Sequence, residues 1–132
     1  MNNPVLCDVS KLIGRVLISL IFILSGWAKI GGYAGTQAYM ESAGVPGILL
    51  PLVILVELGG GLAILCGFFT RWVSLLLAAF CLLSAALFHY VPDDQMQMIA
   101  FMKNLAIAGG FLILACSGAG GYSLDQLFSR DK

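Results

Sequence analysis

Four long apolar stretches, separated by short polar segments, account for most of this chain. They cover residues 12–29, 48–69, 72–91 and 98–117. Each is close in length to the roughly 20 residues that an α-helix needs to cross a bilayer. The connections between the later stretches are short, which favours antiparallel neighbours. The pattern therefore predicts an all-α protein, a four-helix transmembrane bundle with up-down-up-down order.

The longest connection, residues 31–46, has its own pattern. Aromatic and apolar residues interleave there with polar ones, namely Tyr33, Gln37, Tyr39, Met40 and Glu41. This pattern predicts a short amphipathic helix at the outer membrane interface, ended by Gly44 and Pro46. An ordinary aromatic anchor at the interface is the alternative interpretation. No room is left for a soluble domain, so residues 1–132 are expected to form a single integral membrane domain.

Composition agrees with a membrane location. Hydrophobic residues make up 60% of the chain and charged residues only 11%, far from the values of soluble domains. The lipid bilayer is therefore the expected partner, and a formal net charge of zero gives no indication of nucleic-acid binding. Gly59, Ala63 and Gly67 repeat at a four-residue spacing, which predicts a close helix contact through small residues.

Basic residues gather on one predicted side of the membrane, and they are Lys11, Arg15, Arg71, Arg130 and Lys132. The opposite loops carry Glu41, Asp93 and Asp94. Because positively charged loops stay inside, both termini are predicted to be cytoplasmic.

Glu57 is the most informative residue, because it lies in the middle of an apolar stretch where a carboxylate is costly and often functional. At a rise of about 1.5 Å per residue it lies about 13 Å below the outer edge of its span. Lys29, His89, Lys103 and Asn104, from three other spans, fall in the same outer half. These positions predict a polar pocket open toward the outer face. Lys103 is the expected ionic partner of Glu57.

Each of these residues also has a structural interpretation. A Glu57–Lys103 pair would satisfy two buried charges without any chemistry. Lys29 suits an interfacial lysine whose head reaches toward water, and His89 suits a group at a helix end. In the functional interpretation, Glu57 exchanges protons, while Lys29, His89, Lys103 and Asn104 bind a small ligand.

The chain lacks the residues that hold most redox cofactors. Its four cysteines, Cys7, Cys66, Cys81 and Cys116, are scattered without a paired motif, which argues against a thiol–disulfide carrier. One histidine cannot provide a bis-histidine haem site, and the cysteines are not clustered for iron–sulfur ligation. We therefore expect no metal site and no intrinsic cofactor.

Several short motifs, in their order and spacing, resemble the DoxX family of small four-span bacterial membrane proteins. They are Gly14-Arg15, Ser25-Gly26-Trp27-Ala28-Lys29, Glu57-Leu58-Gly59-Gly60, Gly67-Phe68-Phe69-Thr70-Arg71, His89 and Lys103-Asn104. The resemblance covers residues 12–125 and implies a bacterial inner-membrane protein. Family members include the membrane subunit of a thiosulfate:quinone oxidoreductase and proteins linked to oxidative, quinone and thiol stress. The resemblance thus implies a quinone-linked or redox-partner role.

Three functions follow from these observations, and they leave open whether the protein is an enzyme. The first is a redox subunit that binds quinone and receives electrons from a soluble or membrane partner. The second is a proton-coupled transporter or channel for a small molecule, for which four spans are few unless a homo-oligomer supplies more. The third is a membrane scaffold or stress-response protein whose polar cluster fixes helix packing.

Overall fold

The computed structural model describes residues 3–130, and these residues form helices without a strand. In chain order the elements are α1 (Pro4–Gly31), α2 (Tyr33–Ser42), η1 (Gly47–Leu49), α3 (Leu50–Ile54), η2 (Leu55–Gly59), α4 (Gly60–Cys66), α5 (Thr70–Ser84), η3 (Ala85–His89), α6 (Gln95–Ser117) and α7 (Leu124–Arg130). The predicted all-α class is confirmed. Lys132, one of the residues that set the predicted orientation, lies outside the described residues.

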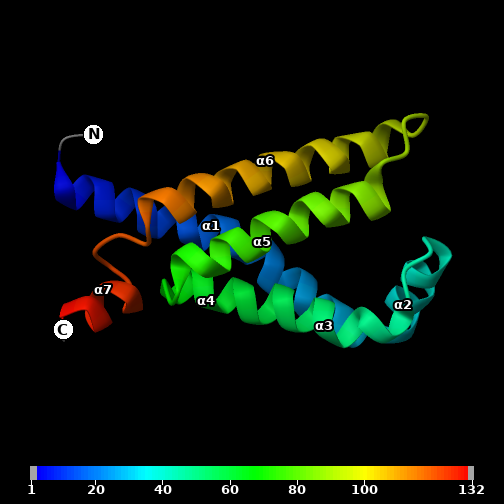
Figure 1. Cartoon of the computed structure of the whole chain (residues 1–132), viewed down its shortest axis with the longest axis horizontal. Helices are drawn as coiled ribbons and strands as arrows, with labels where there is room; N and C mark the ends of the chain where they lie inside the picture. The colour runs from blue at the N-terminus through cyan, green and yellow to red at the C-terminus, as the bar shows by residue number, and fades with distance from the viewer. Residues whose placement is uncertain (1–2, 131–132) are drawn as a thin grey trace.

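Four long rods make up the molecule, because η1, α3, η2 and α4 follow one another without a break, as do α5 and η3 (Figure 1). Three of them, Gly47–Cys66, Thr70–His89 and Gln95–Ser117, are long and apolar enough to cross a membrane. Their ends differ from the predicted spans by up to three residues. The other predicted span, residues 12–29, lies within the 28 residues of α1, whose Leu17, Leu20 and Leu24 are exposed. α1 thus has the apolar outer face expected of a span.

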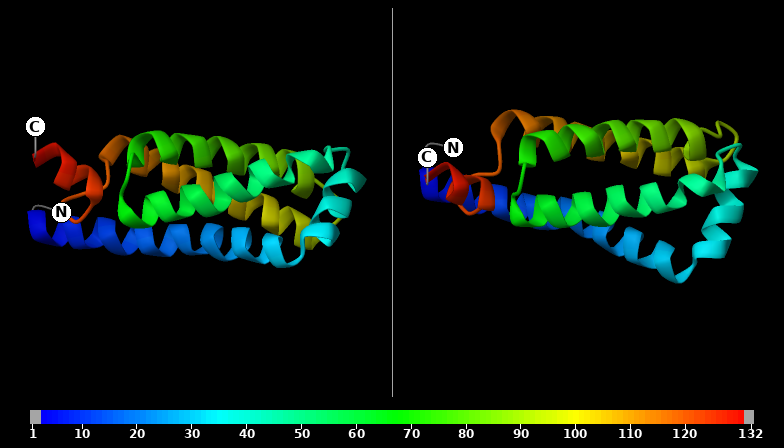
Figure 2. Two further views of the ribbon diagram at one scale, coloured as in Figure 1. Left: turned by 90° about the horizontal axis from the view of Figure 1, so that it is seen from below. Right: turned by 60° about the horizontal axis from the view of Figure 1, so that its bottom comes forward.

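The core of the bundle lies nearer the end that carries the two termini. Phe22, Ile64, Leu77 and Phe111 are buried there, and the rings of Phe22 and Phe111 meet edge to face at 5.4 Å. Toward the other end α1 diverges from α5 and α6 (Figure 2). The space between α1, α2 and the second and third rods, called the wedge below, contains a pocket. α2 crosses this open end, where the sequence predicted a short helix.

Glycines allow α1 to approach the second span closely. A Cβ atom at Gly26 would lie 3.0 Å from the backbone nitrogen of Leu58, and one at Gly61 would lie 2.9 Å from Ile23. The predicted stripe of Gly59, Ala63 and Gly67 is therefore wrong, since Gly59 is exposed. The π-helical turn η2, which ends at Gly59, changes the face that the following residues present.

The C-terminal segment folds back against the end of the bundle where the chain begins (Figure 2). Arg15 is 1% exposed. Its guanidinium donates to the carbonyls of Ile64 and Leu65, at 3.2 and 3.0 Å, and to that of Tyr122. The Asp125 carboxylate accepts hydrogen bonds from the amides of Phe69 and Thr70, where α5 begins. The short helix α7 follows in this segment.

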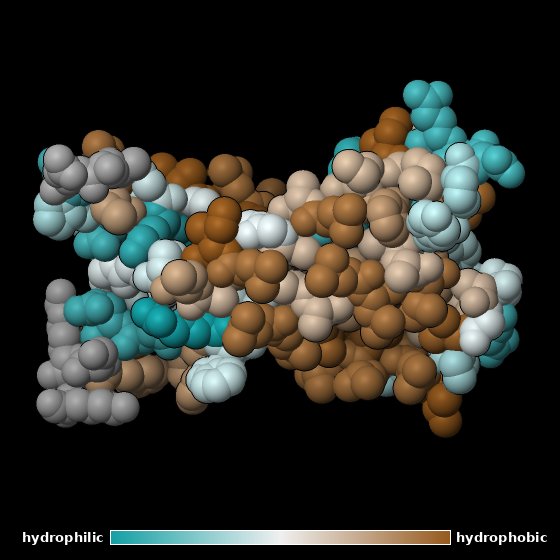
Figure 3. All heavy atoms as spheres, turned by 45° about the horizontal axis from the view of Figure 1, so that its top comes forward, coloured by the Kyte–Doolittle hydropathy of each residue, from teal (hydrophilic) through white to brown (hydrophobic). Residues whose placement is uncertain are grey.

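On the face of the molecule shown in Figure 3, hydrophobic residues cover the middle and hydrophilic residues gather toward the two ends. This banding is what a bundle surrounded by lipid requires, because charged groups are stable only where water or headgroups reach them.

Candidate functional site

A pocket of about 370 Å³ occupies the wedge between α1, α2 and the second and third rods. Ligand pockets in proteins start near roughly 300 Å³. Its walls are apolar and are formed by Leu49, Leu52, Val53, Val56, Phe80, Leu83 and Leu87. The polar lining residues come from two levels of the bundle. Glu57 and its neighbour Lys29 are the deeper group, since Glu57 lies midway along the second rod, whereas Thr36 and Tyr39 on α2 and His89 at the end of the third rod lie at the open end. The pocket therefore suits a ligand with a largely apolar body.

Lys29 and Glu57 form an ion pair, with 2.7 Å between Lys29 Nζ and Glu57 Oε1. The Glu57 side chain is 5% exposed and that of Lys29 is 26% exposed. Lys29 Nζ also donates to Ser25 Oγ at 2.7 Å. Ser25, one turn earlier on α1, thus helps to position the pair. Of the two partners, only Lys29 is substantially exposed to the pocket.

This pair leaves two polar positions for a ligand. A lysine ammonium has three N–H donors, and Glu57 and Ser25 take two of them. Glu57 Oε2 has no partner among the described residues. One donor and one acceptor of opposite charge are therefore available side by side at the end of an apolar pocket.

Two π-helical turns place polar residues at the pocket. η2 carries Glu57 and η3 ends at His89, and these turns lie on facing rods. A π-helical turn inserts one extra residue into a helix and occurs frequently at functional sites. Both helices therefore depart from regular geometry where they line the pocket.

His89 is oriented by a neighbour on the next helix. Its Nδ1 lies 2.8 Å from Gln97 Oε1 on α6. With an amide oxygen as partner, the neutral ring carries its proton on Nδ1 and leaves Nε2 as an acceptor. His89 thus adds a second proton-accepting group at the end of the pocket opposite Glu57.

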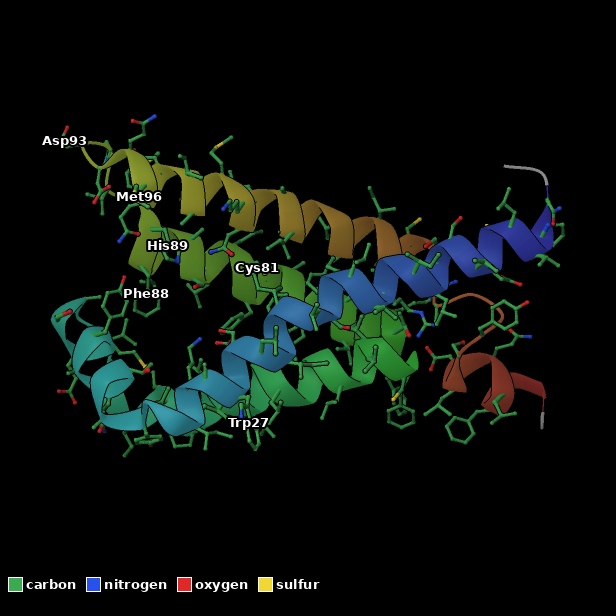
Figure 4. The ribbon with its side chains drawn as sticks, turned by 180° about the vertical axis from the view of Figure 1, so that it is seen from behind. Trp27, Cys81, Phe88, His89, Asp93 and Met96 are labelled. Carbon is green, nitrogen blue, oxygen red and sulfur yellow. The ribbon has the colours of Figure 1, made fainter. Side chains whose placement is uncertain are left out.

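α2 closes one side of the pocket through an aromatic contact. The rings of Tyr39 and Phe88 stack with centroids 5.7 Å apart, and the Tyr39 hydroxyl donates to the Phe88 carbonyl at 3.3 Å. Phe88 extends from the end of the third rod toward α2, while Trp27 points away from the bundle (Figure 4). The contact between Tyr39 and Phe88 therefore has to break before α2 can move away from the third rod.

The structure brings together three of the five predicted site residues, Lys29, Glu57 and His89. The predicted Glu57–Lys103 pair is wrong, because Lys103 is exposed on the outer face of α6. Asn104 is half-buried on α6 and does not line the pocket. Lys103 and Asn104 do lie in the expected half of the bundle, but α6 is turned so that neither reaches the site.

The site also contains three residues that were not predicted to take part in it, namely Thr36, Tyr39 and Phe88. Tyr39 and Thr36 belong to the segment that was expected to lie at the interface, and the sequence does not indicate that it folds over the wedge. The four-residue spacing of Ser25 and Lys29 is the one local signal, since such residues lie on the same helix face.

Comparison with known proteins agrees with this membrane architecture. The family model described as DoxX matches residues 10–90. The chain is 56% identical to "Inner membrane protein YqjF" of Escherichia coli (strain K12) over 123 residues, which cover 93% of this chain and 95% of that protein. It is 41% identical to "Inner membrane protein YphA" of the same organism over 125 residues, 89% of each chain.

A more distant relative is "Putative oxidoreductase CatD" of Bacillus subtilis (strain 168), 32% identical over 71 residues, which cover 54% of this chain and 53% of that protein. No solved structure matches the chain. The family match covers more than half of the chain, and the similarity to YqjF extends over nearly all of it. The chain therefore belongs to the DoxX family, as a multi-pass protein of the inner membrane.

Proposed function

We propose that the pocket binds the ring of a membrane quinone and that the protein is a quinone-linked subunit of a redox system. The observation that carries this proposal is the Lys29–Glu57 pair at the end of an apolar pocket. A quinone ring presents carbonyl acceptors and, once reduced, hydroxyl donors. The free N–H of Lys29 can donate to a quinone carbonyl, and Glu57 Oε2 can accept from a hydroxyl of the reduced form.

The roles of the side chains follow from this arrangement. A quinone supplies two-electron chemistry, and its reduction takes up two protons. Lys29 holds the ring by donating to a carbonyl oxygen, and Glu57 exchanges a proton at the same position. His89 Nε2 is a second proton-exchange position near the outer end of the pocket. The apolar walls keep water from the ring and suit its isoprenoid tail.

Electrons would come from another protein, because this chain's single histidine and scattered cysteines do not provide ligands for a haem or an iron–sulfur cluster. The printed name of the Bacillus subtilis relative mentions an oxidoreductase, which supports a redox context. With both termini in the cytoplasm, as the positive-inside rule predicts, the pocket lies in the periplasmic half of the membrane. The electron donor would then be a membrane partner or a periplasmic protein.

A proton-coupled transporter is the second candidate, and buried hydroxyl groups favour it. Ser19 and Ser74 are fully buried farther along α1 and α5, so polar positions continue beyond Glu57. Phe22 and Leu77 separate them from the pocket, and transport would require this apolar layer to open. Substrate-driven proton flux in reconstituted vesicles that disappears in Glu57→Gln would favour this function.

Bound quinone, measured after mild purification, tests the first proposal. The wild-type protein should retain more quinone per molecule than an unrelated inner-membrane protein purified in the same way. Loss of one hydrogen bond to a charged group costs about 1.5–3 kcal/mol, so Lys29→Gln should lower the retained quinone about tenfold or more. Glu57→Gln should lower it as well, since it removes the charge that positions Lys29.

Lys103→Gln is the matched control, because it makes the same change on an exposed lysine outside the pocket. This variant should retain quinone like the wild type. Equal quinone in the wild type and in the unrelated protein would contradict the proposal, as would an equal loss in Lys29→Gln and Lys103→Gln.

A further inference from the structure

A second pocket, of about 420 Å³, lies at the end of the bundle where the two termini meet. It is bounded by the start of α1, the turn into α5 and the end of α6. Its lining is polar and includes Lys11, Thr70, Arg71, Ser117, Gly118 and Asp125. The quinone proposal makes no use of these residues.

Two cations of this pocket converge on the end of α6. Lys11 Nζ donates to the Ser117 carbonyl at 3.3 Å. A Cβ atom at Gly118 would lie 3.3 Å from Arg71 Nη2, so the guanidinium lies directly against this glycine. Gly118 has a φ of +80°, which glycine adopts without strain. Lys11 and Arg71 therefore both reach the end of α6, at the adjacent positions Ser117 and Gly118.

Arg71 has no hydrogen bond or ion pair among the described residues, so all five of its N–H donors are available. The nearby carboxylate of Asp125 is already engaged. Its two oxygens accept from the backbone amides of Phe69 and Thr70 at 2.7 and 2.8 Å, where the positive end of the α5 dipole also compensates its charge. The pocket thus keeps a net attraction for an anion.

The level of the pocket indicates where the anion would come from. Lys11 precedes the first predicted span, and α5 begins and α6 ends at the same level, which is where lipid headgroups lie. Trp72, 74% exposed, lines the pocket, and Leu75 and Leu76 continue the exposed apolar face one turn deeper. Acyl chains can follow this face while a phosphate group remains at the cations.

We infer that this pocket binds the phosphate of an anionic phospholipid, with Arg71 and Lys11 as its ligands. Guanidinium matches phosphate geometry with two parallel hydrogen bonds, and basic pockets between spanning helices are known sites for anionic headgroups. The inference does not rest on the quinone proposal, because the two pockets share no residue.

Native mass spectrometry of the delipidated full-length protein tests the inference, with phosphatidylglycerol and phosphatidylcholine added separately. A basic residue near an anionic lipid contributes about 1 kcal/mol, which corresponds to about fivefold in affinity. Phosphatidylglycerol should therefore bind more tightly than phosphatidylcholine, and Arg71→Gln and Lys11→Gln should each weaken its binding about fivefold. Arg71→Lys, which keeps the charge, should lose less than Arg71→Gln.

Lys103→Gln again serves as the control, since it removes an exposed cation on the same protein outside this pocket. Equal affinity for the two lipids would overturn the inference, as would an equal loss in Arg71→Gln and Lys103→Gln. Inorganic phosphate is the last probe. Displacement of phosphatidylglycerol by inorganic phosphate at an equal concentration would overturn the lipid assignment in favour of a free anion, and retention of the lipid would support it.

Discussion

Lys29 at the end of α1 and Glu57 in the π-helical turn η2 form an ion pair of 2.7 Å across the wedge of the bundle. One partner is buried and the other is partly open to the pocket. Attraction between charges is strong at such depth, but the cost of removing both from water is also large. The pair is thus a poor means of stabilising the fold and a suitable means of presenting two charged groups to a ligand.

Replacing one partner of this pair should destabilise the protein more than replacing both. Glu57→Gln leaves the Lys29 ammonium without its counter-charge. The expected loss is about 2 kcal/mol of unfolding free energy, below the roughly 3–5 kcal/mol for fully buried pairs, because Lys29 is 26% exposed. The Lys29→Met, Glu57→Gln double variant should recover most of the loss. The measurement is unfolding in mixed micelles of three variants, Glu57→Gln, Lys29→Met and the double variant.

The same variants separate a scaffold from a ligand site. If the pair only fixes packing, the double variant regains both stability and activity in cells. If the pair binds a ligand, the double variant regains stability but retains no quinone. A loss in the double variant equal to the sum of the losses in the two single variants would show that Lys29 and Glu57 do not interact.

Sequence reasoning predicted the depths of the polar residues but not the faces of the helices. The rise per residue fixes depth, so Lys29, Glu57 and His89 were correctly placed in one half of the bundle. Rotation about the helix axis depends on packing with other helices, and Lys103 was therefore paired with Glu57 although it lies on the outer face of α6. The next residue, Asn104, is half-buried. A shift of one residue along α6 thus separates an exposed position from a partly packed one.

The predicted small-residue stripe failed for the same reason. Gly59, Ala63 and Gly67 follow one another at a four-residue spacing, but Gly59 is exposed and Ala63 is only half-buried. The close contacts are instead made by Gly60 with Leu77 and by Gly61 with Ile23. Spacing alone thus identified a face of the helix but not whether another helix packs against it.

Arg15 should hold the C-terminal segment on the bundle. Arg15→Lys keeps the charge but cannot reproduce a planar fork that reaches the carbonyls of Ile64, Leu65 and Tyr122. Each unsatisfied buried group costs about 1–3 kcal/mol, so the segment after Tyr122 should detach before the bundle unfolds. Limited proteolysis should cleave this segment at least several-fold faster in Arg15→Lys. Arg71→Lys is the control, because it makes the same change on an exposed arginine. Cleavage of Arg15→Lys at the rate of this control would contradict the role of Arg15.

The orientation of the chain can be tested with cysteine labelling. Asp93 is exposed in the loop before α6, and Cys7 lies near the opposite end of the bundle. A maleimide that does not cross membranes should label Asp93→Cys in intact spheroplasts and should label Cys7 only after permeabilisation. The reverse pattern would place both termini in the periplasm and the pocket with Lys29 and Glu57 in the cytoplasmic half.

Tyr39 should control access to the pocket that contains Lys29 and Glu57. Its stacking on Phe88 and its hydrogen bond to the Phe88 carbonyl fasten α2 over the wedge. An aromatic pair contributes about 0.5–1.5 kcal/mol beyond its buried area, which corresponds to about 2–12-fold in the population of an open state. Tyr39→Ala should therefore increase the labelling rate of a cysteine placed at Ser84, which lines the pocket, by a factor in this range.

Tyr39→Phe separates the two contributions, because it removes the hydroxyl and keeps the stacked ring. Its labelling rate should lie between those of the wild type and Tyr39→Ala. Tyr33→Ala is the matched control, since Tyr33 begins the same helix without lining the pocket, and it should leave the rate at Ser84→Cys unchanged. Equal rates in all four proteins would mean that ligands enter between the spanning helices from the lipid, and that α2 is a fixed cap.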